Sequence, residues 1–338
     1  GHEGQNLLYL NQGGETGLTD AGIPFADGFE VTMVVALVDA DRDGDLDVLA
    51  GNDGAPVFYY ANAATSPPFD GVVGVSLTTG AAALTDLAVA DFNGDGAVDF
   101  AVGAHEERPK VYYGDGSAEP FANATSETVG TLAAQTVALI AADTAGNGTT
   151  DLIMASASHP LTTYMNTGAR SYGGNIDPEL PNTTGDSRAI TAGDMDNDGD
   201  VDIVIGYRNA PNTVVRSNDS ITPFAAASPD AITADGDDTR AIAVADVDGD
   251  GWLDVVAGNR NQANTLYLND RTPESFAATV GSDITADADD TRGIALGDLN
   301  GDGAVDLFVC NHGDPDRVVL NNGTLDPFAD VTSSPLGD

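Results

Sequence analysis

An acidic segment recurs along the length of this chain and limits the folds that the chain can adopt. Six segments have the form Asp-x-Asp/Asn-x-Asp/Asn-Gly-x-x-Asp, or a decayed version of it. They begin at Asp39, Asp91, Asp143, Asp194, Asp246 and Asp298. Successive copies start 52, 52, 51, 52 and 52 residues apart. Such even spacing in an Asp-rich chain indicates one supersecondary unit copied in tandem.

Each copy has the same internal order. In the fifth copy, an apolar run at 241–245 leads into the acidic loop and another at 253–258 leaves it. A tyrosine-containing run at 265–269 ends in Asn, and a Phe-led run at 276–280 closes the unit. Short runs rich in Val, Ile, Tyr and Thr, separated by Gly, Asn and Asp, predict strands joined by turns. Four strands in ~50 residues predict an all-β fold, a β-propeller of four-stranded blades.

The number of blades follows from the count of repeats. Six complete repeats of about 52 residues favour six blades in a single domain over 1–338, with seven blades as the alternative. Outer strands are in surplus, at 1–30 and at 316–338. The Phe-led run occurs seven times, from Phe25 to Phe328, when the copy that begins with Tyr172 in the third repeat is counted. The Tyr/Asn run also occurs seven times, ending at Asn11, Asn62, Asp115, Asn166, Asn218, Asn269 and Asn321.

The surplus strands bear on assembly. One terminal pair can complete the sixth blade in cis, which leaves the other pair as an edge. A strand edge is suited to adding onto a neighbouring subunit, and a head-to-tail contact of this kind builds a filament of identical chains. A homopolymer is therefore one expected arrangement, and the alternative is that the extra pair folds back on its own chain.

The acidic loops have the composition of a metal site. In 246–254, Asp-Val-Asp-Gly-Asp-Gly-Trp-Leu-Asp, the side chains at positions 1, 3, 5 and 9 can converge if the loop turns sharply. Gly251 at position 6 permits that turn because glycine tolerates positive φ. The carbonyl of position 7, here Trp252, can add another oxygen. Oxygen ligands without sulfur or imidazole select Ca²⁺ over transition metals, and flexible geometry favours Ca²⁺ over Mg²⁺.

The six loops differ in how complete this set is. The full carboxylate set occurs at Asp39/Asp41/Asp43/Asp47, Asp194/Asp196/Asp198/Asp202 and Asp246/Asp248/Asp250/Asp254. In two other loops an amide replaces one carboxylate: Asp91/Asn93/Asp95/Asp99 and Asp298/Asn300/Asp302/Asp306. An amide oxygen carries no charge, so weaker binding is predicted there. The position-7 carbonyls belong to Asp45, Ala97, Asp200, Trp252 and Ala304. In the third loop Ala145 replaces the carboxylate at position 3, so weak or no occupancy is expected at Asp143, Asn147 and Asp151.

A single Asp-rich turn is usually a solvated hairpin loop. Six copies in register, each between two apolar runs, favour metal instead. We expect four or five Ca²⁺ ions, and at most six, one for each loop. Their expected role is structural, because each complete loop gathers carboxylates whose mutual repulsion would otherwise open the hairpin.

Composition narrows the classes of partner. Twelve Lys and Arg stand against 54 Asp and Glu, which gives a formal net charge of −42, and Lys110 is the only lysine. Such a chain is unsuited to nucleic acid or to an anionic membrane surface, which need cationic side chains. No apolar run approaches the ~20 residues that span a bilayer, so membrane insertion is not expected. The single cysteine, Cys310, excludes an intramolecular disulfide.

The units resemble the FG-GAP/VCBS repeats of integrin α-chain propellers and of many secreted bacterial proteins. The resemblance rests on the acidic loop at this spacing and covers essentially the whole chain. It implies that the loop joins the two inner strands of a blade and holds Ca²⁺. The Phe-Gly/Gly-Ala-Pro signature is poorly kept, and Val-Gly-Ala at 102–104 and Ile-Gly-Tyr at 205–207 take its place.

The leading functional hypothesis is an extracellular module, secreted or on the cell surface, that Ca²⁺ rigidifies for binding, adhesion or a structural role. Its partner would be a protein or a glycan. The first alternative is a carbohydrate-binding lectin. A polysaccharide lyase or hydrolase is less favoured, and we expect no enzyme, because no nucleophile–base pair stands apart from the repeat. Arg188, Arg240 and Arg292 recur before the loops and predict either a partial ring of cations for an acidic ligand or ion pairs with adjacent Asp residues.

Overall fold

The computed structural model describes residues 6–11, 23–25, 31–62, 68–69, 71–78, 83–157, 159–168, 172, 185–218, 222–224, 227–232, 234, 236–276, 279–329, 331 and 333–335. Every regular element among them is a β-strand. No helix in this part of the chain is long and apolar enough to cross a membrane. The chain divides into two compact units: unit 1 comprises 1–8 and 23–180, and unit 2 comprises 9–22 and 181–338.

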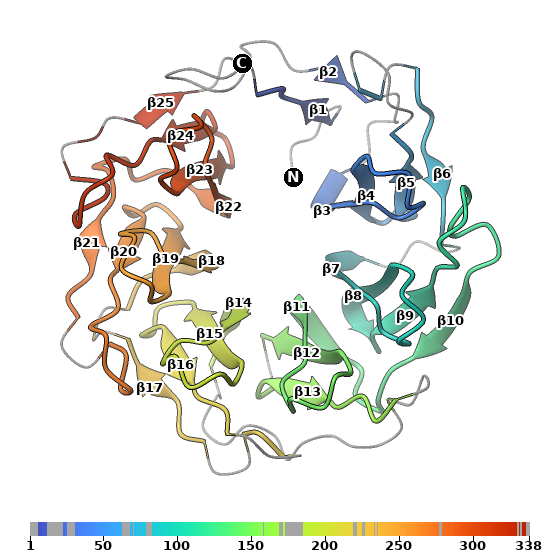
Figure 1. Ribbon diagram of the computed structural model, residues 1–338, viewed down its shortest axis with the longest axis horizontal. Coiled ribbons are helices and arrows are strands. Elements are labelled where there is room, and N and C mark those ends of the chain that lie inside the picture. Colours follow the sequence, from blue (N-terminus) through green and yellow to red (C-terminus); the bar gives the residue numbers. More distant parts are fainter. Residues whose placement is uncertain are drawn as a thin grey trace. The chain divides into compact units, whose positions relative to one another are not determined.

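Unit 1 contains a two-stranded sheet and the strands of the first three repeats, all antiparallel and paired mainly in chain order (Figure 1). Strand β8 also pairs with β11, which joins the second and third repeats into one sheet. The strands are β1 (Leu7–Leu8), β2 (Ile23–Pro24), β3 (Val31–Val38), β4 (Asp47–Asp53), β5 (Phe58–Tyr60), β6 (Val75–Ser76), β7 (Leu84–Ala90), β8 (Asp99–Glu107), β9 (Lys110–Tyr113), β10 (Thr125–Thr128), β11 (Ala134–Ala142), β12 (Asp151–Ser156) and β13 (Thr162–Tyr164).

Unit 2 contains three four-stranded antiparallel sheets, one for each of the last three repeats. Their strands are β14 (Ser187–Gly193), β15 (Asp202–Tyr207), β16 (Thr213–Val215), β17 (Asp230–Ala231), β18 (Thr239–Ala245), β19 (Asp254–Asn259), β20 (Thr265–Tyr267), β21 (Ser282–Asp283), β22 (Thr291–Gly297), β23 (Asp306–Asn311), β24 (Arg317–Val319) and β25 (Ser333–Pro335). The predicted all-β architecture of repeated four-stranded sheets is confirmed.

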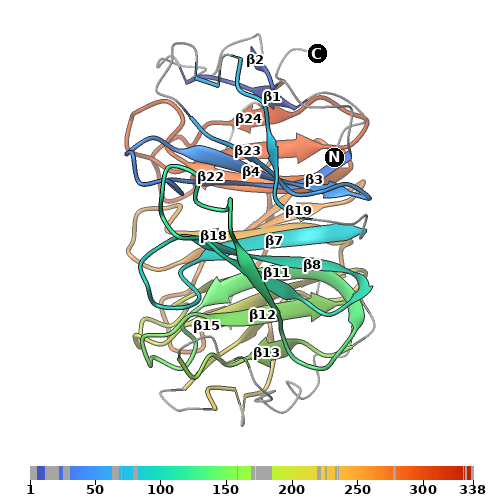
Figure 2. The same cartoon turned by 90° about the vertical axis from the view of Figure 1, so that its right-hand side faces the viewer.

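Within a unit, a second strand that lies between two repeats is buried on both faces, because the sheets of those repeats cover it. In β19, Val255 packs with Val204 of the preceding repeat, whereas Val256 packs with Leu307 of the following one. This double burial explains why the second strands are nearly continuous apolar runs. The sheets of unit 1 stack in the same way, and Figure 2 shows β7, β8, β11 and β12 one above another.

Glycine in the second strand permits this close approach of two sheets. A Cβ built at Gly258 would lie 2.8 Å from the Cγ2 atom of Thr291 in the next repeat. A Cβ at Gly206 would lie 2.8 Å from the Cγ2 atom of Thr239. The glycines at 102–104 and 205–207 are therefore required by packing, which gives a physical reason for this part of the repeat.

The Phe-led runs are turns, so their prediction as strands is wrong. Phe276 is buried, and its N–H donates to the carbonyl of Glu274 at 2.7 Å while its carbonyl accepts from Thr279 N–H at 3.2 Å. The ring enters the core and the backbone turns around it, so the fourth strand, β21, begins only at Ser282. Equivalent buried rings lie in turns at Phe69, Phe121, Phe224 and Phe328.

The two terminal strand pairs have different partners. The C-terminal pair, β24 and β25, completes the sheet that begins with β22 and β23. The N-terminal pair, β1 and β2, forms its own antiparallel sheet, with Leu7 opposite Pro24 and Leu8 opposite Ile23. Other parts of the predicted surplus segments, including 1–5, 12–22, 26–30 and 336–338, lie outside the described residues.

Candidate metal centres

Each acidic loop joins the first and second strands of its repeat and is shaped by its own side chains. The carboxylate at position 1 accepts a hydrogen bond from the N–H of the position-6 glycine, as Asp246 does from Gly251 at 2.9 Å. That glycine has a φ of +90°, in the left-handed region that the sequence argument required. The position-6 glycines of the other loops share this conformation: Gly44, Gly96, Gly148, Gly199 and Gly303.

The middle of the loop repeats one local hydrogen bond. The side chain at position 3 accepts from the N–H of position 5, as Asp248 Oδ1 does from Asp250 at 3.1 Å. The side chain at position 5 accepts from the N–H of position 7, as Asp250 Oδ1 does from Trp252 at 2.9 Å. The position-7 residues Asp45, Ala97, Asp200 and Ala304 donate in the same way. Their carbonyl groups remain predicted ligands.

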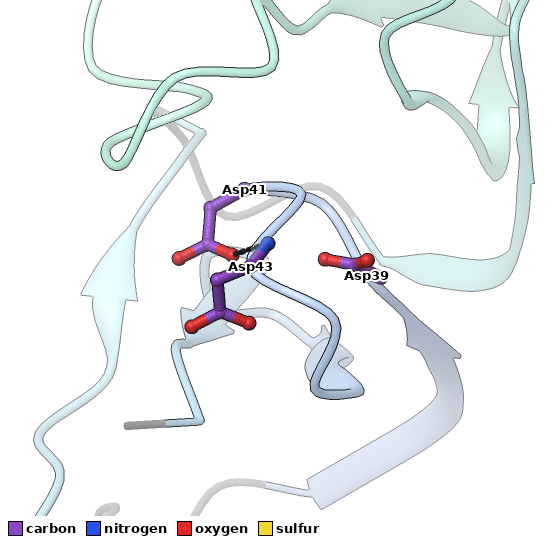
Figure 3. A group of neighbouring side chains, drawn as sticks. All are labelled: Asp39, Asp41 and Asp43. Carbon is purple, nitrogen blue, oxygen red and sulfur yellow. Dashed lines mark hydrogen bonds between the residues drawn. The ribbon is translucent and has the colours of Figure 1, made fainter. Parts of the chain in front are cut away.

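Among the described residues, three loops bring three carboxylates together, and they are the three loops with a complete carboxylate set. Within each group, one oxygen from every residue lies within 4.8 Å of the others. Figure 3 shows the first group, with Asp41 and Asp43 side by side and Asp39 across the loop. The groups are Asp39/Asp41/Asp43, Asp194/Asp196/Asp202 and Asp246/Asp248/Asp250.

The electrostatics of these groups favour a cation. Burial, followed by the charge of Asp47, raises the pKa of Asp41. Burial, followed by the charge of Asp198 or of Asp250 respectively, raises the pKa of Asp196 and of Asp248. Gathering like charges in a partly buried loop is unfavourable without a positive charge to offset it.

Two arginines supply some positive charge in unit 2. The Nε atom of Arg271 lies 2.7 Å from Asp250 Oδ2, and the Nε atom of Arg216 lies 3.7 Å from Asp196 Oδ2. Each is a single cation beside several carboxylates, so negative charge remains in excess.

The donor chemistry fits a hard divalent cation. Every side-chain ligand in the three groups is a carboxylate oxygen, which is the preference of Ca²⁺. In the first loop, Asp39 Oδ1 is buried without a hydrogen-bond partner, and this leaves its lone pairs available to a metal.

The position-9 aspartates have a second role that the sequence did not reveal. All six are at most 1 % exposed, and each accepts two backbone N–H groups at 2.7–3.0 Å. In the fifth repeat, Asp254 accepts from Val247 at position 2 and from Asn269, two residues after the third strand, β20. The carboxylate therefore fastens the loop to the third strand. The six residues are Asp47, Asp99, Asp151, Asp202, Asp254 and Asp306.

Burial affects the protonation of these carboxyls. It raises the pKa of Asp99 and of Asp254 to about 6, and that of Asp202 to about 7, although two backbone donors oppose the shift in each case. The third strands all end before the predicted Asn or Asp, so those predicted ends are wrong: β5 ends at Tyr60, β9 at Tyr113, β13 at Tyr164, β16 at Val215, β20 at Tyr267 and β24 at Val319. In two repeats the residue that the carboxylate binds also differs from the predicted one. The residue held by the carboxylate is Gly114 in the second repeat and Ser217 in the fourth, not Asp115 and Asn218.

The amide-containing loops keep the shape of the complete ones. Asn93 and Asn300 occupy position 3 and accept from the N–H of Asp95 at 2.9 Å and of Asp302 at 2.8 Å. The position-1 carboxylates Asp91 and Asp298 accept from their glycines at 2.7 and 2.9 Å. The predicted ligand atoms are therefore presented by the same backbone, with one charge fewer.

The third loop retains this shape without a carboxylate at position 3. Asp143 accepts from Asn147 N–H at 3.0 Å and Gly148 N–H at 2.7 Å, and Asn147 accepts from Thr149 N–H at 2.8 Å. Asp151 additionally accepts from the Thr144 hydroxyl at 2.7 Å. The hydrogen-bond pattern of the hairpin is therefore kept although one carboxylate is missing.

A second missed feature links consecutive repeats. The amide of Asn269 donates to the carbonyl of Met195 in the loop of the preceding repeat, at 2.8 Å. Asn166 donates to Phe92, and Asn321 to Val247, also at 2.8 Å. The recurrence of Asn after the tyrosine-containing strand was the sequence signal for this bond.

The recurring arginines form ion pairs with nearby aspartates. This confirms the second of the two alternatives predicted for them, ion pairs with adjacent Asp residues. Their nitrogen–oxygen distances are 2.6 Å for Arg188–Asp186, 2.7 Å for Arg240–Asp238 and 2.7 Å for Arg292–Asp290.

Arg260, which the sequence reading did not single out, extends the pairing across repeats. It lies 4.0 Å from Asp238 of its own repeat and 3.5 Å from Asp290 of the next.

Among solved structures, the chain resembles an Agrocybe aegerita lectin described as specifically recognising non-reducing terminal N-acetylglucosamine. The two are 17% identical, the match covers 99% of this chain and 89% of the lectin chain, and the TM-score is 0.64. The chain also resembles BBS1N in complex with ARL6DN, in crystals soaked with lead or mercury. There the identity is 12%, the match covers 90% of this chain and 82% or 81% of the other, and the TM-score is 0.56.

At these identities the likeness concerns the fold, which is a β-propeller of four-stranded blades. A comparison with curated proteins finds no match. The sequence model of the FG-GAP-like repeat matches five overlapping windows, at 39–102, 91–154, 143–205, 194–257 and 246–309. These windows extend over most of the sequence and have the spacing of the acidic loops. The chain therefore belongs to the FG-GAP-like repeat family.

Proposed function

We propose that this protein is an extracellular binding module whose β-propeller fold is stabilised by Ca²⁺. The observation that carries the proposal is the meeting of three carboxylates in each of three loops, with oxygens within 4.8 Å of one another. Each complete loop takes one ion, and the two amide-containing loops bind more weakly, for about four or five ions in all. The ions act on stability, because they bind the folded loop and not the unfolded chain.

Ion counting in solution tests the metal sites. Equilibrium dialysis against Ca²⁺ is expected to give four or five ions for the wild type and one fewer for Asp248→Asn. The variant Asp143→Asn, in the third loop, is expected to keep the wild-type number. Asp283→Asn, on an exposed strand outside the loops, is the matched control. Equal counts for the wild type and Asp248→Asn would contradict the assignment.

Thermal unfolding tests the role of the ions. A chelator is expected to lower the melting temperature, since ligand at about 100 times its dissociation constant stabilises the folded state by about 2.7 kcal/mol per site. The same melting temperature with and without chelator would show that the ions, if bound, do not support the fold.

The location and partner are inferred from charge. A net charge of −42 suits a surface in salty or calcium-rich water outside the cell. It also disfavours nucleic acid and anionic lipid as partners. A protein or a glycan is the proposed ligand class, with adhesion or a structural role as the consequence of binding, and no catalytic role is assigned to any residue.

A lectin is the second candidate, and the fold of the Agrocybe aegerita protein favours it. That protein is described as recognising non-reducing terminal N-acetylglucosamine. A glycan array that includes this terminus, probed in Ca²⁺ and again in chelator, tests the candidate. Saturable binding to a terminal sugar supports it, and an array without binding favours a protein partner.

A further inference from the structure

Residues 7–11 have the features of a third strand of the repeat. Asn11 donates its amide to the carbonyl of Leu299 at 2.7 Å. Leu299 is position 2 of the sixth loop, and Asn321 makes the equivalent bond to position 2 of the fifth loop at 2.8 Å. Strand β1 then pairs with β2 as third strands pair with fourth strands. The N-terminal strands are thus the outer half of a further blade.

This half-blade covers only part of the sheet of the first repeat. Leu8 and Phe25 pack on Val48, Ala50 and Tyr60, and these three residues are at most 6 % exposed. The rings of Phe25 and Tyr60 meet edge to face with centroids 5.2 Å apart. The outer part of this sheet face is therefore covered.

The inner part of the same face is exposed and apolar. Val35 is 58 % exposed and Leu37 is 60 % exposed, both on β3, and Leu46 in the first loop is 55 % exposed. Val35 and Leu37 are two positions apart on β3 and so share one sheet face, and Leu46 is exposed in the adjoining loop. Together, beside a well-packed cluster, they form a surface suited to another apolar element.

The fifth repeat shows what covers this position when a whole blade precedes it. By register, Ile242 corresponds to Val35, and Val244 corresponds to Leu37. Ile242 is 8 % exposed and packs with Val244 on a cluster that contains Ala189 of β14 and Val204 of β15. The elements that cover the inner face are therefore the first and second strands of the preceding repeat.

We propose that the face formed by Val35, Leu37 and Leu46 binds a β-hairpin of the repeat type, a first strand and a second strand joined by an acidic loop. Among the described strands, β1 pairs only with β2. In a complete repeat, the third strand pairs with the fourth strand at one edge and with the second strand at the other. The second edge of β1 is therefore the position at which a second strand would pair. The hairpin would extend this sheet by main-chain hydrogen bonds and cover the exposed side chains with its apolar face. Residues 239–259 of this chain are a complete example of such a hairpin.

A fusion tests this proposal. Residues 239–259 are appended to the full chain after Asp338, through a linker as long as the segment between β21 and β22, and unfolding is followed in Ca²⁺. Tethering raises the effective concentration of the hairpin, so a short segment that is unfolded alone can still dock. The expected result is a melting temperature at least ~3 °C above that of the unfused chain. A synthetic peptide of the same sequence, added in trans, is expected to bind saturably.

Matched variants locate the docking face. Val35→Asp with Leu37→Asp is expected to abolish the gain in the fused chain, and both side chains are exposed enough for the unfused variant to keep its melting temperature. Val280→Asp, at a residue 85 % exposed elsewhere, is expected to leave the gain intact. A fusion without any gain, or a gain that survives the double variant, overturns the proposal. Light scattering that shows a dimer lost in the double variant would assign the face to a second copy and would equally overturn it.

Discussion

The buried aspartate at position 9 allows the structural and the metal-binding contributions of one residue type to be separated. Asp151 lies in the third loop, where little or no metal is expected, and it accepts N–H groups from Thr144 and Asn166 at 3.0 and 2.7 Å. In Asp151→Asn one side-chain oxygen is replaced by an NH₂ group. One buried backbone donor then faces another donor and loses its partner.

The magnitude follows from that single unsatisfied group. A buried donor without a partner costs about 1–3 kcal/mol, so we take about 2 kcal/mol for Asp151→Asn. With an unfolding entropy of about 2.1 cal/mol/K per residue, a 338-residue chain that unfolds in one transition should melt about 3 °C lower. This loss is expected to be the same in Ca²⁺ and in chelator.

Asp254→Asn removes the same pair of bonds in a complete loop, to Val247 and Asn269. In chelator it should cost the same ~3 °C, and in Ca²⁺ it should cost more, because ligand stabilisation at that site is also reduced. Scanning calorimetry of both variants in both conditions is the assay, with Asp283→Asn as control. An unchanged melting temperature for Asp151→Asn would refute the role of the bonds. An equal loss for Asp254→Asn in both conditions would refute its role as a ligand.

Three further results are expected. Asp86 accepts N–H groups from Leu87 and Leu139, and burial raises its pKa to about 6. The contribution of this carboxyl group to stability is therefore complete below pH ~4 and is lost as the pH rises through about 6. The difference between the melting temperatures of the wild type and of Asp86→Asn should therefore fall between pH ~4 and about 6. A difference that stays constant over this interval would contradict the prediction. Gly258→Ala should lower the free energy of unfolding in urea by about 1–3 kcal/mol, because the new Cβ meets Thr291. Gly293→Ala, whose Cβ has its nearest contact at 3.6 Å, should lower it by less than ~1 kcal/mol. Equal losses in the two variants would count against the packing argument. In chelator, added salt should raise the melting temperature because it screens a net charge of −42, and a fall between ~0.01 M and ~1 M salt would be inconsistent with this.

The sequence was sufficient for the fold class and for the complete loops because both depend on local, repeated patterns. The positive φ of Gly251 and the meeting of Asp246, Asp248 and Asp250 follow from residues only a few positions apart. Periodicity alone could not separate a buried Phe in a turn from a Phe in a strand. Phe276 therefore led to a fourth strand placed six residues too early.

Contacts between distant residues were not predictable in the same way. The bond from Asp254 to Asn269 depends on the third strand returning beside the loop, and the Asp at position 9 already had a sufficient explanation as a ligand. The pairing of Arg260 with Asp290 depends on how two sheets of unit 2 stack. The exposed face at Val35 also has no signature in the sequence, because its apolar pattern is that of every first strand.

The amide bonds between consecutive repeats determine which pieces of the chain can be expressed alone. Asn269 and Met195 are 74 residues apart, so a fragment of a single 52-residue repeat separates donor from acceptor. In a tandem array, where each repeat depends on its neighbours, the smallest autonomous fragment then contains at least two consecutive repeats. A truncation that removes the sixth repeat takes away Asn321, which loosens the fifth loop at Val247 and leaves the bond between the fourth and fifth repeats in place. Removing a repeat should thus destabilise only the repeat that precedes it in the sequence. This limit would guide the choice of boundaries for permuted or shortened forms of the protein.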